Sequence, residues 1–459
     1  MRFSVVIPTR NRPGTLAATL KTCLNQHAFE DYEIIISDNS DNGDSLTVIK
    51  ELLTKKVQYH RTPKPLAMHD NWEFALQKAT GEYICYLGDD DGLHPDALAR
   101  TNQLFNYGSF QALGSHRVNY FWPNVVQPSQ RDLISIPLGA GLEYLEFLPA
   151  TVANAVIPPE QYSYCLPMIY RGFISRKLCD QAIKKFGRVF QHLIPDIYSG
   201  FLFGWLAKKY AVSLDPLFIE GVSSASNGLA TSMIAENPSQ TQVVDFYRLA
   251  TESEIQNFSE DHPAPKSLNH CVYDVYRTAM NRFGLGEDFQ IDMCAYLNGF
   301  FKNHQITNLQ HRRVIYERMI QLYRDDDRLI SFIQTECRDN MLPSGNELPA
   351  ERPSGIRGDM LHFGGKSMNV SDVADLGILL GKILPIQHDG TYSRLPPSRY
   401  LNESPLEMSL KAEISKRDQE IVNLHALLRE TNLSKTPQRV IKKICRLLGI
   451  TRKPAQNEE

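Results

Sequence analysis

Three consecutive aspartates, Asp89–Asp91, are the residues of this sequence best suited to do chemistry. They follow the short apolar run "YICYLG" and precede Gly92 and a His-Pro pair. Adjacent carboxylates repel one another, so a triplet at a strand end is costly unless a positive group lies among them. Mg²⁺ or Mn²⁺ takes hard oxygen ligands, and Mg²⁺ is usually held by one or two carboxylates together with substrate phosphates. We therefore expect a divalent cation here, where it would neutralise a diphosphate leaving group.

A helix cap is the competing explanation of the triplet. Asp is common at helix starts, where the helix dipole favours it, and Asp96 directly after Pro95 fits that description. A cap accounts for one carboxylate of the triplet, not for three. A calcium loop is a second alternative, but "DDDGLHPD" lacks the alternating ligands and the closing Glu of that motif. We therefore favour a metal site.

Residues 1–110 alternate between strand and helix patterns. Apolar and β-branched runs predict strands at 3–9, 32–38, 57–61 and 83–88, and helical spacing predicts helices near 16–24, 44–55, 70–79 and from Pro95 onward. Four strand–helix units indicate an α/β fold with a mostly parallel sheet and helices on both faces. Ligands bind outside the carboxyl ends of such strands. The polar clusters "TRNR", "SDNSD" and "GDDD" follow three of these strands, so we expect them to meet at one edge.

The remainder of the chain changes pattern twice. Mixed strand and helix patterns continue to about residue 230, helical spacing dominates from about 240 to 338, and Pro and Gly gather in 339–358. The predicted division is 1–230 as one α/β domain with parts 1–110 and 111–230, 231–338 as a helical region, 339–400 as a linker and poorly defined segment, and 401–459 as a helical tail with a basic amphipathic end.

Composition limits the function classes. The 459 residues are 42% hydrophobic and 22% charged, with a net charge of −3, so no basic excess points to nucleic acid. The eight cysteines form no CxxC pair, which favours a reducing, cytoplasmic location without structural zinc. No uncharged apolar run reaches the roughly 18 residues that a membrane span needs.

The C-terminal end carries a local positive charge. Residues 431–459 hold seven Lys and Arg against two Glu, and apolar residues alternate with these cations in 436–450. A basic amphipathic helix of this kind can lie on an anionic membrane surface. A helix docked on the protein explains the pattern equally well, so peripheral membrane contact through 436–450 stays one of two expectations.

Several motifs taken together resemble a known family. "VVIPTRNRP", "YEIIISDNSDNGDS" and "ATGEYICYLGDDDGLHPDAL", in this order, are similar to the family 2 glycosyltransferases with the GT-A fold, over about residues 1–225. The resemblance implies a nucleotide-diphosphate sugar donor, bound by residues 1–110, with acceptor binding and catalysis in residues 111–230. It implies that Pro8, Thr9 and Asp38 contact the base and that the triplet is the family's D-x-D site. Asp90 is assigned to the metal first, Asp89 to ribose or metal, and Asp91 to a direct or supporting metal role.

Further donor contacts are expected nearby. Arg12, in the turn that leaves the first strand, is placed to pair with diphosphate, and Arg10 and Lys64 lie near the same edge. Asn71 stands where the family often has a polar residue near the donor, although a capping or surface Asn is the simpler explanation for it. The loop "GVSSASNG" could offer backbone N–H groups to phosphates, and ordinary turn chemistry also explains it.

Inverting transfer is a single displacement that needs a base for the acceptor hydroxyl. Relatives supply Asp or Glu from a helix start about a hundred residues after the D-x-D, which here points to Asp196, directly after Pro195. A helix cap is its alternative, and Asp215 and Glu143 are rival bases. His192 is either a metal or phosphate contact or a core histidine, and the latter is favoured.

The sequence therefore predicts an inverting, metal-dependent glycosyltransferase that moves a sugar, with UDP-sugar as the favoured donor, to a saccharide or glycolipid acceptor. GDP- and dTDP-sugars remain open. A role in surface polysaccharide or glycolipid synthesis would suit the family. The competing classes are a nucleotidyltransferase-like enzyme and a non-catalytic sugar-nucleotide-binding scaffold. Nucleotidyltransferases usually carry a Gly-rich loop after the first strand, and "TRNRPG" is a poor match to such a loop.

Overall fold

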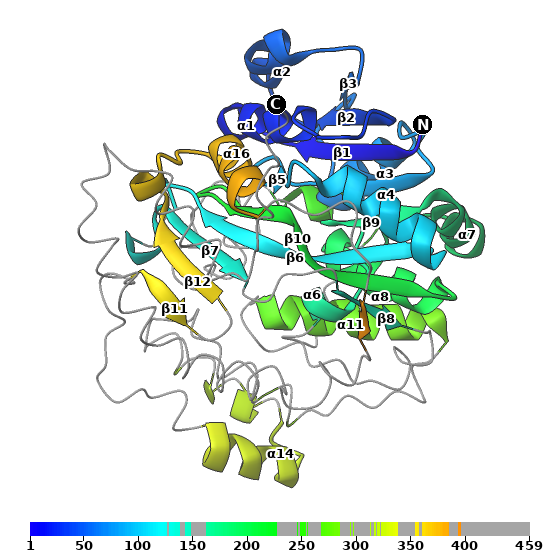
Figure 1. The fold of residues 1–459 in the computed structure, drawn as a ribbon. Coiled ribbons are helices and arrows are strands. Elements are labelled where there is room, and N and C mark those ends of the chain that lie inside the picture. Colours follow the sequence, from blue (N-terminus) through cyan, green and yellow to red (C-terminus); the bar gives the residue numbers. More distant parts are fainter. Residues whose placement is uncertain are drawn as a thin grey trace, which may run out of the picture.

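The computed structural model describes the N-terminal half of the chain almost continuously and the C-terminal half in segments. The described residues are 1–125, 128–137, 143–147, 162–226, most of 246–255, 268–284, scattered positions between 294 and 321, 323–337, 354–357, 360–384 and 393–395. Figure 1 shows them as one mixed sheet with helices packed against it.

Four parallel strands form the N-terminal half of the sheet, in the order β4-β1-β2-β3. Their bounds are β1 (Phe3–Thr9), β2 (Tyr32–Asp38), β3 (Val57–Arg61) and β4 (Tyr83–Tyr86). The register pairs Thr9 with Asp38, so the polar segments after β1 and β2 begin side by side. The strands expected from the β-branched runs are confirmed here, with β4 ending two residues earlier than predicted.

Helices cover both faces of these strands because successive residues of β1 point to opposite sides. Val5 and Ile7 pack with the apolar face of α1, whereas Val6 packs with Trp72 of α3. Pro13, at the first helical position of α1, gives up no hydrogen bond there. The helices of this half are α1 (Pro13–Leu24), α2 (Asp44–Ile49), α3 (Met68–Leu76) and α4 (Ala97–Gly108), with the short 3₁₀ helix η1 (Lys50–Leu52) after α2.

The second half of the domain mixes strand directions. β9 lies antiparallel between β4 and β6, and β10 runs parallel to β6 and antiparallel to the short β5. The strands are β5 (Gly92–Leu93), β6 (Ala112–Phe121), β7 (Leu133–Pro137), β8 (Glu143–Phe147), β9 (Gly172–Ser175) and β10 (Tyr210–Val222), and the helices are η2 (Pro128–Gln130), α6 (Tyr162–Cys165), α7 (Arg176–Phe186) and α8 (Pro195–Leu206). The predicted α/β class is confirmed, with a sheet that is parallel in its N-terminal half and mixed beyond it.

Described C-terminal segments pack onto this domain. α11 (Leu268–Phe283) lies along α8, where the rings of Trp205 and Phe283 stack with centroids 4.5 Å apart. The predicted helical character of the C-terminal region is confirmed by α11, α14 (Asp327–Phe332), η4 (Ile333–Cys337) and α16 (Val373–Ile383).

The predicted linker 339–400 contains described elements that belong to the sheet. β12 (Met360–Gly364) pairs antiparallel with β7 and with β11 (Gly355–Arg357), β13 (Ser393–Leu395) pairs with β8, and η5 (Gly365–Met368) leads to α16, which packs against α1. The described portion of this segment is therefore no linker. The Pro and Gly residues that suggested one lie mostly in 339–353, outside the described residues, and strands of three to five residues give too short a pattern to be read from sequence.

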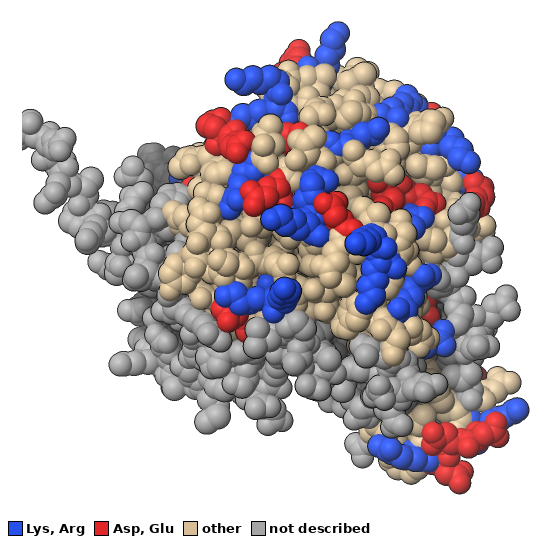
Figure 2. Space-filling model, turned by 90° about the vertical axis from the view of Figure 1, so that its right-hand side faces the viewer, with Lys and Arg blue, Asp and Glu red and all other residues tan. Residues whose placement is uncertain are grey.

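The expectations about membrane spans and about the basic tail concern the whole chain, of which the structure describes only part. Within the described ranges, no helix is both long and apolar enough to cross a membrane. The tail 401–459, with the basic segment 436–450, lies outside the described residues. Positive and negative side chains are interspersed over the face shown in Figure 2.

Candidate active site

The carboxyl ends of β1 and β4 meet at Asp89. Its Oδ2 atom accepts a hydrogen bond from Thr9 Oγ1 at 2.6 Å, and its Oδ1 atom accepts one from Arg12 Nη1 at 3.0 Å. Only 2% of Asp89 is exposed. The residues that the sequence placed after two separate strands, "TRNR" and "GDDD", are thus in direct contact.

The Asp89–Arg12 pair is an ion pair shielded from solvent. Burial raises the pKa of Asp89, and the nearby Arg12 partly offsets this because it favours the charged carboxylate. Burial alone would lower the pKa of Arg12, but Asp89 and Asp90 outweigh it and raise that pKa. Arg12 therefore stays a fixed positive charge beside the triplet.

Asp90 has one carboxylate oxygen engaged and one open. Oδ2 accepts hydrogen bonds from Ser223 Oγ at 2.6 Å and Ser226 Oγ at 2.5 Å, both from the loop that follows β10. Its backbone oxygen accepts a bond from Trp122 Nε1 at 2.9 Å. Among the described residues, none donates a hydrogen bond to Oδ1. The "GVSSASNG" loop thus reaches the triplet through serine hydroxyls, a contact that the sequence reasoning missed.

Asp91 is enclosed by donors. Oδ2 accepts bonds from Gly88 N at 3.1 Å and Tyr170 OH at 2.5 Å, and Oδ1 accepts one from Gly221 N at 2.7 Å. Burial first, and the charge of Asp90 second, raise the pKa of Asp91 to about 7. Both oxygens accept hydrogen bonds and the residue is fully buried, so this carboxylate joins the ends of β4 and β10.

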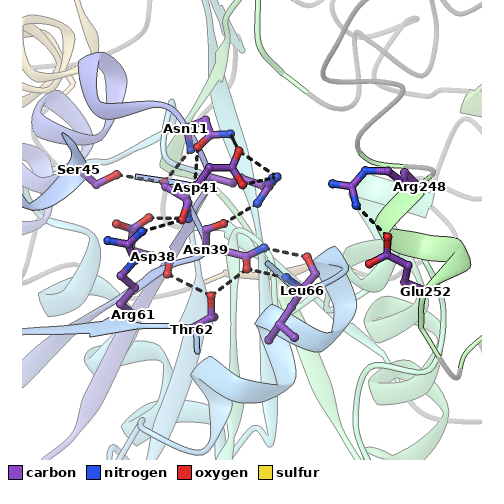
Figure 3. Close-up of polar contacts among 12 residues, drawn as sticks. Asn11, Asp38, Asn39, Asp41, Ser45, Arg61, Thr62, Leu66, Arg248 and Glu252 are labelled. Atoms are coloured by element: carbon purple, nitrogen blue, oxygen red, sulfur yellow. Dashed lines mark hydrogen bonds and ion pairs between the residues drawn. The ribbon is translucent and has the colours of Figure 1, made fainter. Parts of the chain in front are cut away.

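Asp38, expected against the base, is used inside the protein. Tyr59 OH donates to its Oδ2 atom at 2.5 Å and Ser40 N donates to its Oδ1 atom at 2.9 Å, and the residue is fully buried. Burial, followed by the hydrogen bond to Asp38, raises the pKa of Tyr59. Asp38 therefore shapes the turn after β2 rather than presenting its carboxylate at the surface (Figure 3).

The exposed rim of this turn is formed by three other residues. Asp41 accepts bonds from Arg10 Nη2 at 3.0 Å and from Asn11 Nδ2 at 2.7 Å. Asn11 has a left-handed backbone with φ of 55°. The hydrogen bond from Asn11 is the largest influence on Asp41 and lowers its pKa, and Arg10 adds to this. Arg248 faces the rim from the opposite side in Figure 3, where it pairs with Glu252 at 2.8 Å.

The other expected donor residues are placed as follows. Asn71 is buried in α3 and its Oδ1 atom accepts a bond from Ser37 Oγ at 2.7 Å, so it holds the end of β2. Pro8 is half-buried in β1, opposite Ser37 in register. Lys64 is exposed. Of the expected set, Thr9, Arg12 and the triplet gather at one point, whereas Asp38 and Asn71 lie in the supporting structure.

Asp196 stands at the start of α8, one residue after Pro195 at the first helical position. It is partly buried. Burial raises its pKa, which backbone N–H groups of Ile197 and Asp196 itself and the charge of Arg171 partly offset. Arg171 and Glu220 both influence this carboxylate, and Glu220 directly precedes the Gly221 that binds Asp91. Asp196 and the triplet therefore share a common set of neighbours.

Glu220 pairs with two arginines at this position. It contacts Arg117 and lies 2.5 Å from Arg171 Nη1 through Oε1. Burial would raise the pKa of Glu220, but the two guanidinium groups hold it at about 2. Arg171 has a left-handed backbone with φ of 58°, and Tyr170 beside it donates to Asp91. Sequence reasoning missed this cluster. Its residues lie far apart in the sequence, and they come together only because they stand in or next to neighbouring strands.

The rival candidates for the base, and His192, have structural roles or lie outside the described residues. Asp215 is paired at 2.6 Å with Arg100, and both are buried, so it serves the interior. The side chain of Glu143 lies outside the described residues. His192 is a fully buried histidine with Asp274 at 3.2 Å, in keeping with the core alternative.

Comparison with known proteins bears on the class of protein to which this fold and its polar cluster at the strand ends belong. Residues 4–156 match the model of the family described as Glycosyl transferase family 2. This match confirms the resemblance to glycosyltransferase family 2 that the motifs predicted for the N-terminal region of the chain.

Curated relatives match over the same region. A GalNAc(5)-diNAcBac-PP-undecaprenol beta-1,3-glucosyltransferase of Campylobacter jejuni is 32% identical over 117 residues, 25% of this chain and 38% of that protein. The amylovoran biosynthesis glycosyltransferase AmsB of Erwinia amylovora is 27% identical over 132 residues, 27% of this chain and 42% of that protein. The chain thus spans about two fifths of the length of these relatives.

Solved structures show a distant likeness. Staphylococcus aureus TarS 1–349 in complex with UDP-GlcNAc has a TM-score of 0.39 at 13% identity, covering 73% of this chain and 90% of that chain. The mannosyltransferase PcManGT of Pyrobaculum calidifontis, in complex with GDP-Man and Mn²⁺, has a TM-score of 0.36 at 13% identity, covering 71% and 88%. Scores this low support no conclusion about function.

Proposed function

We propose that the chain is an inverting, metal-dependent glycosyltransferase. It moves a sugar from a nucleotide-diphosphate donor, with UDP-sugar as the favoured donor, to a hydroxyl of a saccharide or glycolipid acceptor. The observation that carries this proposal is the contact of Thr9, Arg12 and Asp89 beside Asp90, at the edge where parallel strands end. A fixed cation and an open carboxylate at this edge suit a diphosphate and the metal that accompanies it.

The residues at the triplet fit a metal that the substrate helps to hold. Among the described residues, no group of three or more His, Cys, Asp or Glu side chains could hold a metal ion alone. Mg²⁺ commonly takes one or two carboxylates and completes its shell with substrate phosphates and water. Asp90, through Oδ1, is the first candidate ligand, and Asp89 is the second. Asp91 supports them, because it is fully buried and accepts three hydrogen bonds from two backbone N–H groups and Tyr170. Bound Mg²⁺ or Mn²⁺ would neutralise charge on the departing diphosphate.

We propose the following protein contacts to the donor. Arg12 is positioned to pair with diphosphate, and Pro8 and Thr9 to line the path of the nucleotide. Asp38 supports the contact with the base by shaping the turn after β2, while Asn11 and Asp41 present the exposed polar atoms at the rim of that turn. We assign Asp89, whose charge Arg12 balances, to the ribose or the metal.

Asp196 is the proposed base. An acceptor hydroxyl attacks the anomeric carbon, the bond to the diphosphate oxygen breaks, and the hydroxyl proton passes to the Asp196 carboxylate. Burial makes this carboxylate more basic than an exposed Asp, which suits proton abstraction. A single displacement of this kind inverts the anomeric configuration.

A role in surface polysaccharide or glycolipid synthesis draws on the relatives. The names of two relatives include the words "PP-undecaprenol" and "amylovoran biosynthesis". We place the protein in the cytoplasm, with peripheral contact at the inner membrane face through residues 436–450.

Product analysis tests the function. The protein is incubated with UDP-, GDP- and dTDP-sugars and Mn²⁺, with water as the acceptor for slow hydrolysis, and ³¹P NMR follows the phosphates. The proposal predicts release of a nucleoside diphosphate, and ¹H NMR at early times, before mutarotation, should show a released sugar of inverted anomeric configuration. Release of pyrophosphate would instead identify a nucleotidyltransferase, and unchanged donors across the panel would favour a binding scaffold.

A further inference from the structure

A buried carboxylate–imidazole pair joins α11 to the loop before α8. His192 is 0% and Asp274 1% exposed, and His192 Nε2 lies 3.2 Å from Asp274 Oδ2. The other oxygen of Asp274 lies 3.3 Å from Arg277 Nη2, on the next turn of α11. α11 lies beyond residues 4–156, the region that matches the glycosyltransferase family.

The second ring nitrogen of His192 fixes the position of its proton. Ile194 N donates to His192 Nδ1 at 3.0 Å. An imidazole nitrogen that accepts a hydrogen bond carries no proton, so in the neutral ring the proton resides on Nε2. That proton points to Asp274, which therefore holds both the tautomer and the orientation of the ring.

Ile194 is the residue at which α8 begins. It is the N-cap residue of this helix, and its carbonyl accepts the first helical hydrogen bond, from Tyr198 N at 3.2 Å. Asp196 follows two residues later, in the first turn. The upstream end of the same loop is also held, because Glu73 Oε2 accepts bonds from Val189 N at 3.1 Å and Phe190 N at 3.0 Å.

We propose that Asp274 is a positioning residue for Asp196, acting through His192 and the backbone N–H of Ile194. This inference rests on the proposed function, in which Asp196 is the base. It assigns a role in the reaction to a helix outside the family-matched region of the chain. A base must lie within hydrogen-bond reach of the acceptor hydroxyl, so small shifts of the first turn of α8 change the rate.

Packing alone does not account for this pair. α11 already packs on α8 through Trp205 and Phe283, and through Phe201 and Tyr276, whose ring centroids lie 5.0 Å apart. Buried ionic groups are poor sources of stability compared with apolar side chains of similar volume. A carboxylate that dictates one tautomer supplies a fixed direction, which apolar packing does not.

The test substitutes Asp274→Asn in the full chain. Asn keeps the volume but can present its amide N–H₂ to Nε2, which moves the proton to Nδ1 and turns it against Ile194 N–H. We expect kcat for donor hydrolysis to fall about ten- to hundredfold. The donor KM and the Mn²⁺-dependent affinity for UDP should stay unchanged, because the triplet is untouched, and the pH profile of kcat should shift.

Phe283→Leu is the matched control. It removes aromatic packing from the same α11–α8 contact, farther along the helices, and should lower thermal stability with kcat retained. A second readout does not depend on activity. ¹⁵N NMR of histidine-labelled wild type, with the His192 signal assigned by its loss in His192→Gln, should place the proton on Nε2.

Three results would overturn the inference: an Asp274→Asn variant with wild-type kcat, a kcat loss no larger than that of an equally destabilised Phe283→Leu variant, or a His192 proton on Nδ1. Failure of the proposed function is recognised separately, because wild type itself would then release no nucleoside diphosphate. If Asp274→Asn does not fold, the NMR measurement on wild type still decides whether the relay exists.

Discussion

The three adjacent aspartates differ in what their carboxylates contact. Asp89 is paired with Arg12, Asp90 is held at one oxygen by serine hydroxyls, and Asp91 accepts three hydrogen bonds in the interior. Three neighbouring positions therefore combine charge compensation, an open ligand atom and a structural anchor. Substitutions at each should affect different properties.

Asp91→Asn should destabilise the protein by about 1–3 kcal/mol, because an amide N–H₂ would face the backbone N–H of either Gly88 or Gly221. Thermal denaturation measures the loss. Asp90→Asn is the control, since its amide oxygen can still accept the serine hydroxyls, and its melting temperature should stay close to that of wild type. Equal melting temperatures for the two variants would argue against the anchoring role of Asp91.

His94 should make stability depend on pH. It is fully buried, Asp96 N donates to its Nδ1 atom at 3.1 Å, and burial lowers its pKa to about 4, with Asp96 opposing. The unfolded chain binds a proton near pH 6.5 and the folded chain only near pH 4. The stabilisation is therefore complete above pH 6.5 and is lost as the pH falls toward 4, by up to about 1.4 kcal/mol per pH unit.

Urea unfolding at pH 7 and pH 5 measures this dependence. His94→Gln should be less stable at pH 7 and should lose less stability on acidification than wild type does. Identical losses in both proteins would show that His94 does not titrate in this way.

At the scale of elements, helices from distant regions of the chain hold β5 and the triplet in place. Thr19 Oγ1 of α1 donates to the backbone oxygen of Asp91 at 2.7 Å, and Leu93 N donates to Thr22 Oγ1 at 3.0 Å. α16 packs on the same α1 and β5 from the C-terminal side. The site thus depends on a segment more than 200 residues downstream. Substitutions at two glycines, one beside the triplet and one in α16, test these contacts.

Gly221→Ala and Gly377→Ala should have opposite effects. A Cβ atom at Gly221 would lie 1.6 Å from the backbone oxygen of Asp90, so Ala must displace the triplet and abolish metal-dependent nucleotide binding. At Gly377 the nearest atom is 3.7 Å away, and Ala in the middle of α16 should stabilise the protein by about 0.5–1 kcal/mol. Calorimetric binding and thermal denaturation of both variants test the pair. Retained nucleotide binding in Gly221→Ala would contradict the role given to the β10 end.

At the scale of the whole molecule, prediction from sequence succeeded where local pattern decides the outcome. The strand bounds 3–9 and 32–38 match β1 and β2 because β-branched runs end at turn residues there. The contact of Thr9 and Arg12 with Asp89 followed from parallel topology. The burial of Asp38 under Tyr59 did not, since partners from separate strands decide whether a carboxylate faces solvent.

Long-range pairings account for the rest of what the sequence did not reveal. His192 and Asp274 are 82 residues apart, and no local pattern links them. Tyr170 and Arg171 directly precede β9, which runs antiparallel to both β4 and β6. The spacing of apolar residues does not reveal the direction in which a strand runs. The short strands β11 and β12 form because β7 offers an edge, so their existence depends on tertiary structure.

Membrane association of the whole molecule is expected to depend on residues 436–450. If residues 436–450 form a basic amphipathic helix, the full chain should co-sediment with anionic liposomes, less strongly at high salt, while a chain ending at residue 430 should not. Neutral liposomes are the control. Equally weak sedimentation of both chains would remove the membrane from the account.

The most direct test of the central claim is calorimetric titration of UDP, GDP and dTDP into the full chain, with Mn²⁺ and with EDTA, for wild type and Asp90→Asn. We predict that one nucleotide, with UDP favoured, binds wild type only with Mn²⁺ and that Asp90→Asn loses this binding while remaining folded. Binding that ignores both the metal and Asp90, or no binding of any nucleotide by wild type, would contradict the assignment of this edge as a donor site.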